Sequence, residues 1–409
     1  MKVIFTLGSA VVGGGTNVIF EHATRMVDEG EEVYVITDNP VAPEEYAWHA
    51  SAHKLKWITY DDLEGMTFDV AIGTWWRTIY ELYKIKAKQY IYFVQSIESR
   101  FYPDSEEGIK MLVDLTYSLG LKVITEATWI KEWLERKYGL DVTLVKNGLK
   151  KEIFTKEGDT YEKCSGLRVL IEGPVDVDFK NVPKTRDLVK SSKASEIWLL
   201  TSSQIDSFEG VDRVFSRIPV KDCAKIYRSC DVIVKLSYVE GMFGPPLEMF
   251  HCGGTCIVYD VTGHDEYIKD GYNGYVVKTD DDEKVVEYIN KLCEDKKELN
   301  RLKKNALATA DKWPSWKESS GEFYKAVKNI YKKEKMANDV LEFKSKFFFN
   351  IYEKYEAKNQ GLKVQESINK DLNNIVNKTS FKRKLGNRFR KYLPRTYKVY
   401  YKIVHAIKK

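Results

Sequence analysis

Two glutamates, Glu240 and Glu248, stand eight positions apart in a segment rich in glycine and proline. A mostly apolar run at residues 231–236 precedes them and predicts a buried strand. Pro245 and Pro246 suit the first turn of a helix, because the N–H group that proline lacks has no partner there. The sequence therefore predicts a strand, then a loop that holds Glu240, then a helix that carries Glu248.

This arrangement favours the binding of a phosphorylated ligand with many hydroxyl groups. Free backbone N–H groups and the positive end of the helix dipole form an anion site where the helix begins. Carboxylates accept hydrogen bonds, so the two glutamates suit a ribose and a hexose with a phosphate between them. The alternative is an ordinary strand–loop–helix unit with two surface glutamates, and the spacing alone does not exclude it.

Four short motifs occur in order between about residues 218 and 324. They are 226–234 with 237–241, 247–253, a strand at Thr255–Tyr259, and 263–266 with 270–277. Together they resemble the donor-binding domain of the family 4 retaining glycosyltransferases, which have the GT-B fold. Each motif alone is weak evidence, and their order and spacing carry the resemblance.

The resemblance implies a retaining hexosyl or deoxyhexosyl transferase, which moves a sugar from a nucleoside-diphosphate-sugar to a hydroxyl of a glycan or lipid-linked acceptor. Glu248 is then expected to bind the ribose hydroxyls and Glu240 the donor sugar. Positive groups and backbone N–H groups are expected to stabilise the leaving diphosphate. The predicted donor-binding residues are Gly14, Gly15, Lys180, Phe243, Gly244, Glu248 and Glu266, and the predicted catalytic residues are Glu240, Lys180, Gln95 and Glu98.

Two details depart from the pattern of the family. The Phe-Gly pair after Glu240 comes one place late, at Phe243 and Gly244. Residues 173–174 read Gly-Pro where the family has Gly-Arg, so an arginine that helps to hold the diphosphate is missing. Lys180 matches the lysine expected nearby; otherwise it is simply a solvated lysine in a charged loop.

The first half begins with a βαβ unit. An apolar strand at residues 1–7 leads to the glycine run 13–15, a helix at 17–27 that ends at Gly30, and a strand at 32–36. The run is not G-x-G-x-x-G and no acidic residue follows at the right distance, which excludes a nicotinamide dinucleotide site. In the family that the chain resembles, a similar Gly-Gly loop lies over the donor phosphates, which gives Gly14 and Gly15 their expected role.

Alternating strands and helices continue along the chain. Further strands are expected at 68–72, 90–94, 122–125 and 142–145, with helices at 77–87 and 127–138, and a second series begins at 167–171. Such alternation predicts parallel doubly wound sheets, whose ligands bind beyond the strand carboxyl ends. We therefore expect an α/β protein with two Rossmann-like domains facing across a cleft, the GT-B fold. The expected domains are an acceptor-side domain at 1–160, a donor-binding domain at 161–334, and a helical extension with a basic tail at 335–409.

The segment 93–103 resembles a narrower group, the rhamnan-type rhamnosyltransferases, through a Q-x-x-E-x-x-F-Y-P pattern. Many other members of the wider family have a histidine where Gln95 stands, close to the reacting carbon. Glutamine cannot act as a base, so Gln95 is expected to hydrogen-bond the donor or the acceptor. Glu98 is either the group that serves instead or a helix-capping or surface glutamate. The segment favours a deoxythymidine-diphosphate-rhamnose donor, with uridine-diphosphate hexoses second.

The composition of the chain fits an enzyme without a metal or another cofactor. It has 409 residues, 43% of them hydrophobic, with six cysteines that form no C-x-x-C pair and six scattered histidines. The acidic run 280–282 is best explained as a helix cap. No signal peptide and no apolar run of membrane-spanning length is evident, so we expect a cytoplasmic protein. A non-catalytic glycosyltransferase-like subunit that supports an active partner is the alternative, and no recognition motif favours nucleic acid.

The tail is strongly basic. Residues 378–409 hold twelve Lys and Arg and no Asp or Glu, which gives this segment a charge of +12. Because the net charge of the chain is +5, the other residues together carry −7. Apolar residues recur there at helical spacing, which suits an anionic membrane on the inner face of the plasma membrane, where each basic residue contributes about 1 kcal/mol. A lipid-linked acceptor in polysaccharide biosynthesis would follow. The alternative is packing on the enzyme or on a second subunit, and a stripe at positions 364, 368, 372 and 375 makes a homodimer plausible.

Overall fold

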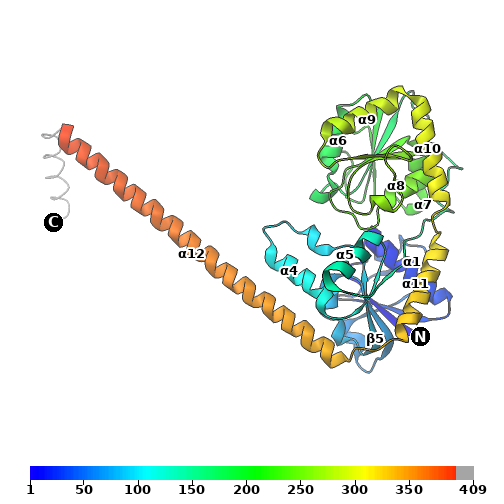
Figure 1. Ribbon diagram of the computed structural model, residues 1–409, viewed down its shortest axis with the longest axis horizontal. Coiled ribbons are helices and arrows are strands. Elements are labelled where there is room, and N and C mark those ends of the chain that lie inside the picture. The colour runs from blue at the N-terminus through cyan, green and yellow to red at the C-terminus, as the bar shows by residue number, and fades with distance from the viewer. Residues whose placement is uncertain (393–409) are drawn as a thin grey trace. The chain divides into compact units, whose positions relative to one another are not determined.

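A seven-stranded parallel sheet forms the centre of the first domain (Figure 1). Its strand order is β3-β2-β1-β4-β5-β6-β7, which places the first strand of the chain inside the sheet. The strands are β1 Lys2–Thr6, β2 Glu32–Thr37, β3 Lys56–Thr59, β4 Phe68–Gly73, β5 Ala87–Val94, β6 Lys122–Thr125 and β7 Val142–Leu144. The computed structural model describes the backbone of residues 1–392, and side-chain surroundings as far as residue 370 except at 363, 364 and 367.

Helices cover both faces of this sheet because its central strands are apolar on both sides. Along β1, Val3 and Phe5 belong to one buried cluster and Ile4 to another on the opposite face, as the alternation of side chains along a strand requires. The helices are α1 Gly14–Asp28, α2 Pro43–Tyr46, α3 Trp76–Ile79, α4 Glu107–Leu115 and α5 Thr128–Tyr138.

The second domain repeats the design with a six-stranded parallel sheet in the order β10-β9-β8-β11-β12-β13. The strands are β8 Arg168–Glu172, β9 Glu196–Thr201, β10 Arg213–Ser216, β11 Val232–Lys235, β12 Thr255–Tyr259 and β13 Tyr275–Val277. The helices are α6 Val182–Lys190, α7 Val220–Ser229, α8 Gly244–His251, α9 Asp282–Glu294 and α10 Lys296–Asp311. The expected α/β fold with two Rossmann-like domains is therefore confirmed.

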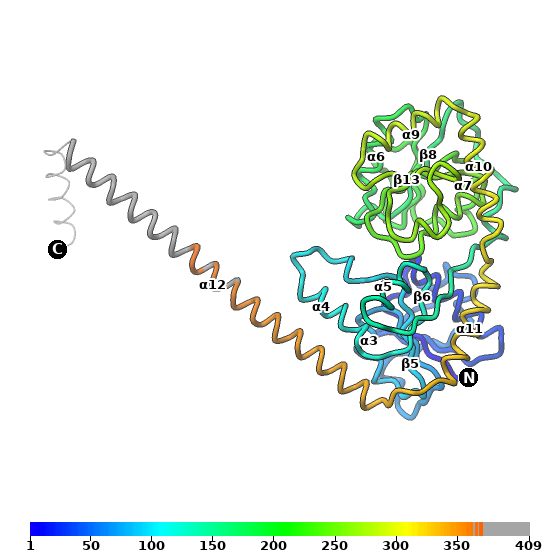
Figure 2. Tube along the Cα trace, viewed as in Figure 1, coloured from blue at the N-terminus to red at the C-terminus, as the bar shows by residue number. Residues whose placement is uncertain are grey.

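The chain returns to the first domain after α10. Figure 2 shows α11 (Trp316–Tyr331) beside the first domain, where it packs against α1. Phe323 of α11 is fully buried in the cluster that contains Val3 and Phe5. The sequence assigned this segment to the second domain, so part of the range 161–334 packs with the first; the outer boundaries of the domains stay a prediction.

Most of the expected elements are present, but the prediction of a helix at 77–87 is wrong. That segment forms the short helix α3, a 3₁₀ turn at Leu82–Lys84, and the start of β5. Its buried residues Ile79, Leu82 and Ile85 recur every three positions. A 3₁₀ turn aligns side chains three apart, so this spacing suits tight turns better than a regular α-helix.

The helical extension is α12, Asn338–Tyr392. Leu341 near its start is fully buried against the first domain, whereas Ile368 of the predicted stripe is 46% exposed. The chain divides into the units Met1–Phe349 and Asn350–Lys409. The part of the basic tail beyond residue 392 lies outside the described residues. Within the described part of the chain, no helix is long and apolar enough to cross a membrane.

Candidate active site

The strand, loop and helix expected around the two glutamates are present. Strand β11 ends at Lys235, Glu240 lies in the loop that follows, and α8 begins at Gly244 and carries Glu248. Both prolines occupy the first turn of α8, as their type predicts. The loop lies at the carboxyl edge of the second sheet, where ligands of parallel sheets bind.

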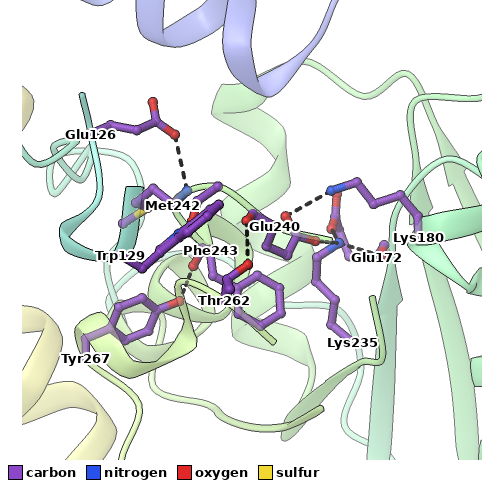
Figure 3. A network of polar contacts seen from close by, with 11 residues as sticks. Glu126, Trp129, Glu172, Lys180, Lys235, Glu240, Met242, Phe243, Thr262 and Tyr267 are labelled. Atoms are coloured by element: carbon purple, nitrogen blue, oxygen red, sulfur yellow. Dashed lines mark hydrogen bonds and ion pairs between the residues drawn. The ribbon is translucent and has the colours of Figure 1, made fainter. Parts of the chain in front are cut away.

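A row of four charged side chains runs along this edge (Figure 3). Lys180 Nζ donates to Glu240 Oε2 at 2.9 Å. Lys235 Nζ lies 3.6 Å from Glu240 Oε1 and donates to Glu172 Oε2 at 2.6 Å. Two ammonium groups and two carboxylates therefore alternate, and their charges balance.

The centre of this row is buried, with Lys235 3% and Glu240 7% exposed. Burial lowers the pKa of Lys235, but Glu172 and Glu240 more than offset it, so the pKa lies above its usual value. Burial likewise raises the pKa of Glu240, yet Lys180 and Lys235 hold it below its usual value. Both groups are therefore charged at neutral pH, which a buried group tolerates only when paired.

Glu248 differs from Glu240 in its protonation. Burial raises its pKa to about 7; a hydrogen bond with Tyr227 opposes the rise, and the nearby Glu172 adds to it. At neutral pH the carboxyl is therefore divided between its acid and its carboxylate form. A group in that state both donates to and accepts from hydroxyls, which suits a ribose.

The start of α8 offers fewer N–H donors to an anion than the sequence suggests. Pro245 and Pro246 have no N–H group, and the N–H of Gly244 donates to the carbonyl of Met242 at 3.0 Å. Phe243 is fully buried, and its carbonyl accepts from the hydroxyl of Tyr267. An anion at this edge therefore depends more on the ammonium of Lys180 than on the helix dipole.

On the first domain, Gln95 and the glycine loop come together. Gln95 follows β5, and its Nε2 donates to the carbonyl of Gly15 at 3.1 Å and to Glu126 Oε2 at 3.5 Å. A side chain at position 15 would begin 3.2 Å from Gln95 Oε1, so the glycine permits this approach. A side chain at position 14 would begin in open space, with nothing but its own helix and chain neighbours within 4 Å of its first carbon.

Glu98 points into the first domain. Its carboxylate accepts from the backbone N–H of Trp76 at 2.8 Å, at the start of α3, and from the hydroxyl of Tyr92 at 3.4 Å. Burial raises the pKa of Glu98 to about 8. A carboxyl that holds its proton at neutral pH is a poor base, so these contacts favour the helix-capping alternative.

The two domains touch at the loop that contains Glu240. Trp129 Nε1 donates to the carbonyl of Gly241 at 2.9 Å, and the N–H of Met242 donates to Glu126 Oε1 at 3.2 Å (Figure 3). A side chain at position 241 would begin 2.2 Å from the carbonyl oxygen of Gln95. Only glycine fits there, which gives a physical reason for the Glu-Gly pair.

Glu266 also lies at this contact. Its carboxylate accepts from the hydroxyl of Thr128 at 3.1 Å and from the Thr128 backbone N–H, and it pairs with Lys146 Nζ at 2.7 Å. Glu266 is 3% exposed. Its oxygens therefore hold first-domain residues, and its expected role in donor binding stays a prediction.

Sequence reasoning did not single out Glu126, Glu172 or Lys235. Each stands at the carboxyl end of a strand, and Lys235 interrupts an otherwise apolar run, so a signal was present. A hollow of about 1080 Å³ lies elsewhere; it is lined by charged residues such as Arg25 of α1 and Lys328 of α11, and none of the predicted site residues line it.

Comparisons with known proteins concern the region that contains this charged row. Residues 209–309, which include Lys235, Glu240 and Glu248, match the family model described as glycosyl transferases group 1. An uncharacterized glycosyltransferase of Methanocaldococcus jannaschii is 27% identical over 189 residues, which are 41% of this chain and 50% of the relative. The match thus spans about half the length of that curated relative.

Solved structures share the fold at low sequence identity. Sucrose-phosphate synthase from Thermosynechococcus elongatus aligns with a TM-score of 0.67 and 15% identity over 81% of this chain and 99% of the other. Anabaena HepE, solved in complex with UDP-glucose, aligns with a TM-score of 0.65 and 13% identity over 80% of this chain and 100% of the other. The chain therefore has the GT-B fold, and residues 209–309 of its second domain are similar to the group 1 glycosyl transferases.

Glu126→Gln is expected to change how stability depends on pH. Burial raises the pKa of Glu126 to about 7 from an ordinary 4.5, so its carboxyl favours folding fully below pH 4.5 and loses that contribution as the pH rises through 7. Glutamine does not titrate, so its contribution to stability does not change with pH. The free energy of unfolding of the wild type should therefore fall relative to the variant by roughly 3 kcal/mol at most between pH 4.5 and 8.

Urea unfolding at a series of pH values measures this difference. Glu132→Gln, on the exposed face of α5, is the matched control and should leave the pH dependence unchanged. A difference between wild type and Glu126→Gln that stays constant with pH contradicts the raised pKa.

Proposed function

We propose that this protein is a retaining glycosyltransferase, which moves a hexosyl or deoxyhexosyl group from a nucleoside-diphosphate-sugar to an acceptor hydroxyl. The observation that carries the proposal is the buried row of charges that ends in Glu240 and Lys180. It lies at the carboxyl edge of the second sheet, within the matched region, where it meets the Gln95 segment of the first domain. Ordinary surface glutamates would not be paired and buried in this way.

The chemistry of the transfer assigns different tasks to Lys180, at one end of the row, and to Glu240 beside it. As the anomeric bond breaks, the leaving diphosphate gains negative charge, and a cation aimed at it stabilises the transition state more than the ground state. Lys180 is the row's exposed ammonium, at 22% exposure, and is the group that reaches the diphosphate. Glu240, which stays ionised, accepts hydrogen bonds from hydroxyls of the donor sugar.

Glu248 and Gln95 complete the proposed donor site. Glu248, with its pKa near 7, meets the ribose hydroxyls. The Gln95 side chain, held against Gly15 and Glu126, hydrogen-bonds the donor or the acceptor and takes no proton. A non-catalytic subunit is the second candidate, but nothing in the geometry favours it, since the charged row is intact.

The donor is proposed to be of the deoxythymidine-diphosphate-rhamnose type, on the basis of the 93–103 segment. Uridine-diphosphate hexoses are the second candidate for the donor, because the Anabaena protein of similar fold was solved with UDP-glucose. Because a ligand stabilises the fold that binds it, by about 2.7 kcal/mol at 100 times its Kd, thermal unfolding ranks the donors. Thymidine diphosphate is expected to raise the Tm more than uridine diphosphate; the opposite order would reverse the assignment.

Lys180→Ala and Glu248→Ala are each expected to reduce sugar transfer by about 10²-fold or more, because each removes a group positioned on the donor. Initial rates with the best donor of the thermal panel measure the effect. Lys184→Ala is the matched control, since Lys184 lies on the neighbouring helix α6 and pairs with Asp280 and Asp282. Rates near the wild-type value in both test variants would remove the donor assignment.

The acceptor is proposed to be a glycan or a lipid-linked sugar, used at the inner face of the plasma membrane. Support comes from the sequence of the tail, whose twelve basic residues and apolar residues at helical spacing suit an anionic surface. As far as Tyr392 this segment is helical. The alternative is contact with a second copy of the chain through the stripe around Ile368.

Truncation after Asn377 is expected to abolish binding to vesicles that contain phosphatidylglycerol while leaving nucleoside-diphosphate binding intact. Vesicle flotation measures the first property and calorimetry the second. Neutral phosphatidylcholine vesicles are the control and should bind neither form. Vesicle binding that survives truncation, or a truncated protein that does not fold, favours the packing alternative.

A further inference from the structure

The two lysines beside Glu240 differ in their freedom to move. Lys180 reaches Glu240 from the loop after β8 and is 22% exposed. Lys235 is the last residue of strand β11 and is 3% exposed. Its ammonium donates to the carbonyl of Glu172 at 3.2 Å and to Glu172 Oε2 at 2.6 Å. Lys235 is therefore fixed in place, whereas Lys180 is able to turn toward a ligand.

The third N–H of the Lys235 ammonium is left for Glu240. An ammonium has three donors, and Glu172 takes two of them. Glu240 Oε1, which faces Lys235 at 3.6 Å, is a buried oxygen without a hydrogen-bond partner among the described residues. The loop 173–179 between Glu172 and Lys180 contains no Lys or Arg. Among the described residues, Lys180 and Lys235 are the cations that act on Glu240.

The proposed function places Lys180 between two anions that compete for its charge. In the structure Lys180 neutralises Glu240, and in the reaction it holds the diphosphate. When it turns to the diphosphate, Glu240 loses one of its two cations while remaining buried. An unpaired buried carboxylate takes up a proton, and a protonated Glu240 no longer accepts from a sugar hydroxyl in the same way.

We propose that Lys235 is a positioning residue, which keeps Glu240 ionised and oriented while Lys180 engages the donor diphosphate. Glu172 holds Lys235 from behind, so the carboxylate of Glu240 keeps a fixed cation on its Oε1 side throughout the reaction. This inference rests on the proposed function and adds a residue to it. Lys235, which is fixed, then serves the sugar-binding carboxylate, and Lys180, which is mobile, serves the leaving diphosphate.

The charged and titratable groups around Glu240 allow a pH test. Lys180 in the loop after β8, Lys235 on β11 and Tyr267 in the turn after β12 interact with Glu240 itself. Glu172 at the end of β8 and Glu248 on α8 interact with Lys235. The two lysines hold the pKa of Glu240 below its usual value. Removing the charge of Lys235 therefore raises the pH at which Glu240 loses its proton.

The test compares Lys235→Met, a neutral side chain of similar length, with the wild type. Isothermal titration measures the affinity for uridine or thymidine diphosphate, whichever binds more tightly, and for the corresponding nucleotide sugar. The affinity for the diphosphate alone should stay within about 3-fold, because Lys180 is intact, while the added affinity from the sugar is lost. At pH 7, kcat should fall by about 10²-fold.

The pH profile separates a positioning role from a merely structural one. The acid limb of kcat in Lys235→Met should move up by at least one pH unit, so that much of the loss is recovered at pH 9. Lys303→Met is the matched control; Lys303 pairs with Asp231 at 3.0 Å, next to the opposite end of β11, and its replacement should not move the limb. An equal loss at every pH overturns the proposal, and so does a large loss of diphosphate affinity.

A second variant covers the case in which Lys235→Met does not fold. The double change Glu172→Gln and Lys235→Met removes both charges of the inner pair and leaves no unpaired carboxylate at position 172. It should show the same shift of the acid limb, and an unshifted limb in this variant also overturns the proposal. A wild type that neither binds nucleoside diphosphates nor transfers sugar rejects the proposed function itself. A fully active wild type with an unaltered Lys235→Met variant rejects the role of Lys235 alone.

Discussion

The burial of the Glu240 carboxylate is the constraint on which the rest of the site depends. A charge that is 7% exposed persists only with partners, and the chain supplies two, Lys180 and Lys235. Placing Lys235 inside the sheet creates a second buried charge, which Glu172 satisfies from the neighbouring strand. The alternating row is thus a consequence of one carboxylate held away from water, and its position at the carboxyl edge follows from the parallel sheet.

The contact between the domains is built on the same loop. Because position 241 has no side chain, the backbone of Gln95 approaches it closely, and Trp129 donates to its carbonyl. Glu126 then accepts from the next residue of the loop, Met242, and from Gln95 on its own domain. A shift of this loop changes hydrogen bonds in both domains, so the geometry around Glu240 and the position of Gln95 are linked through shared partners.

The sequence predicted the architecture well because local periodicity and turn residues determine it. The apolar runs became strands in two parallel sheets, and Glu240 and Glu248 lie on the loop and helix expected for them. The charged row was not predicted, because Lys235 and Glu172 are 63 positions apart and only the crossover of β8 and β11 makes them neighbours. The same limit applies to α11, whose apolar face gave no indication of which domain it would cover. Glu98 shows the reverse case, in which a motif residue is turned inward to cap α3.

The balance of charge in the row also bears on the order of events in the proposed reaction. Without a ligand, two cations meet two anions, and Glu240 Oε2 is occupied by Lys180. A free sugar brings no charge with which to draw Lys180 away, whereas a diphosphate does. Arrival of the diphosphate therefore releases the oxygen that the sugar hydroxyl needs, and Lys235 prevents that release from leaving Glu240 unpaired. On this account the site favours a sugar attached to a nucleoside diphosphate over the same sugar in free form, because the diphosphate draws Lys180 away from the Glu240 oxygen that the sugar hydroxyl then contacts.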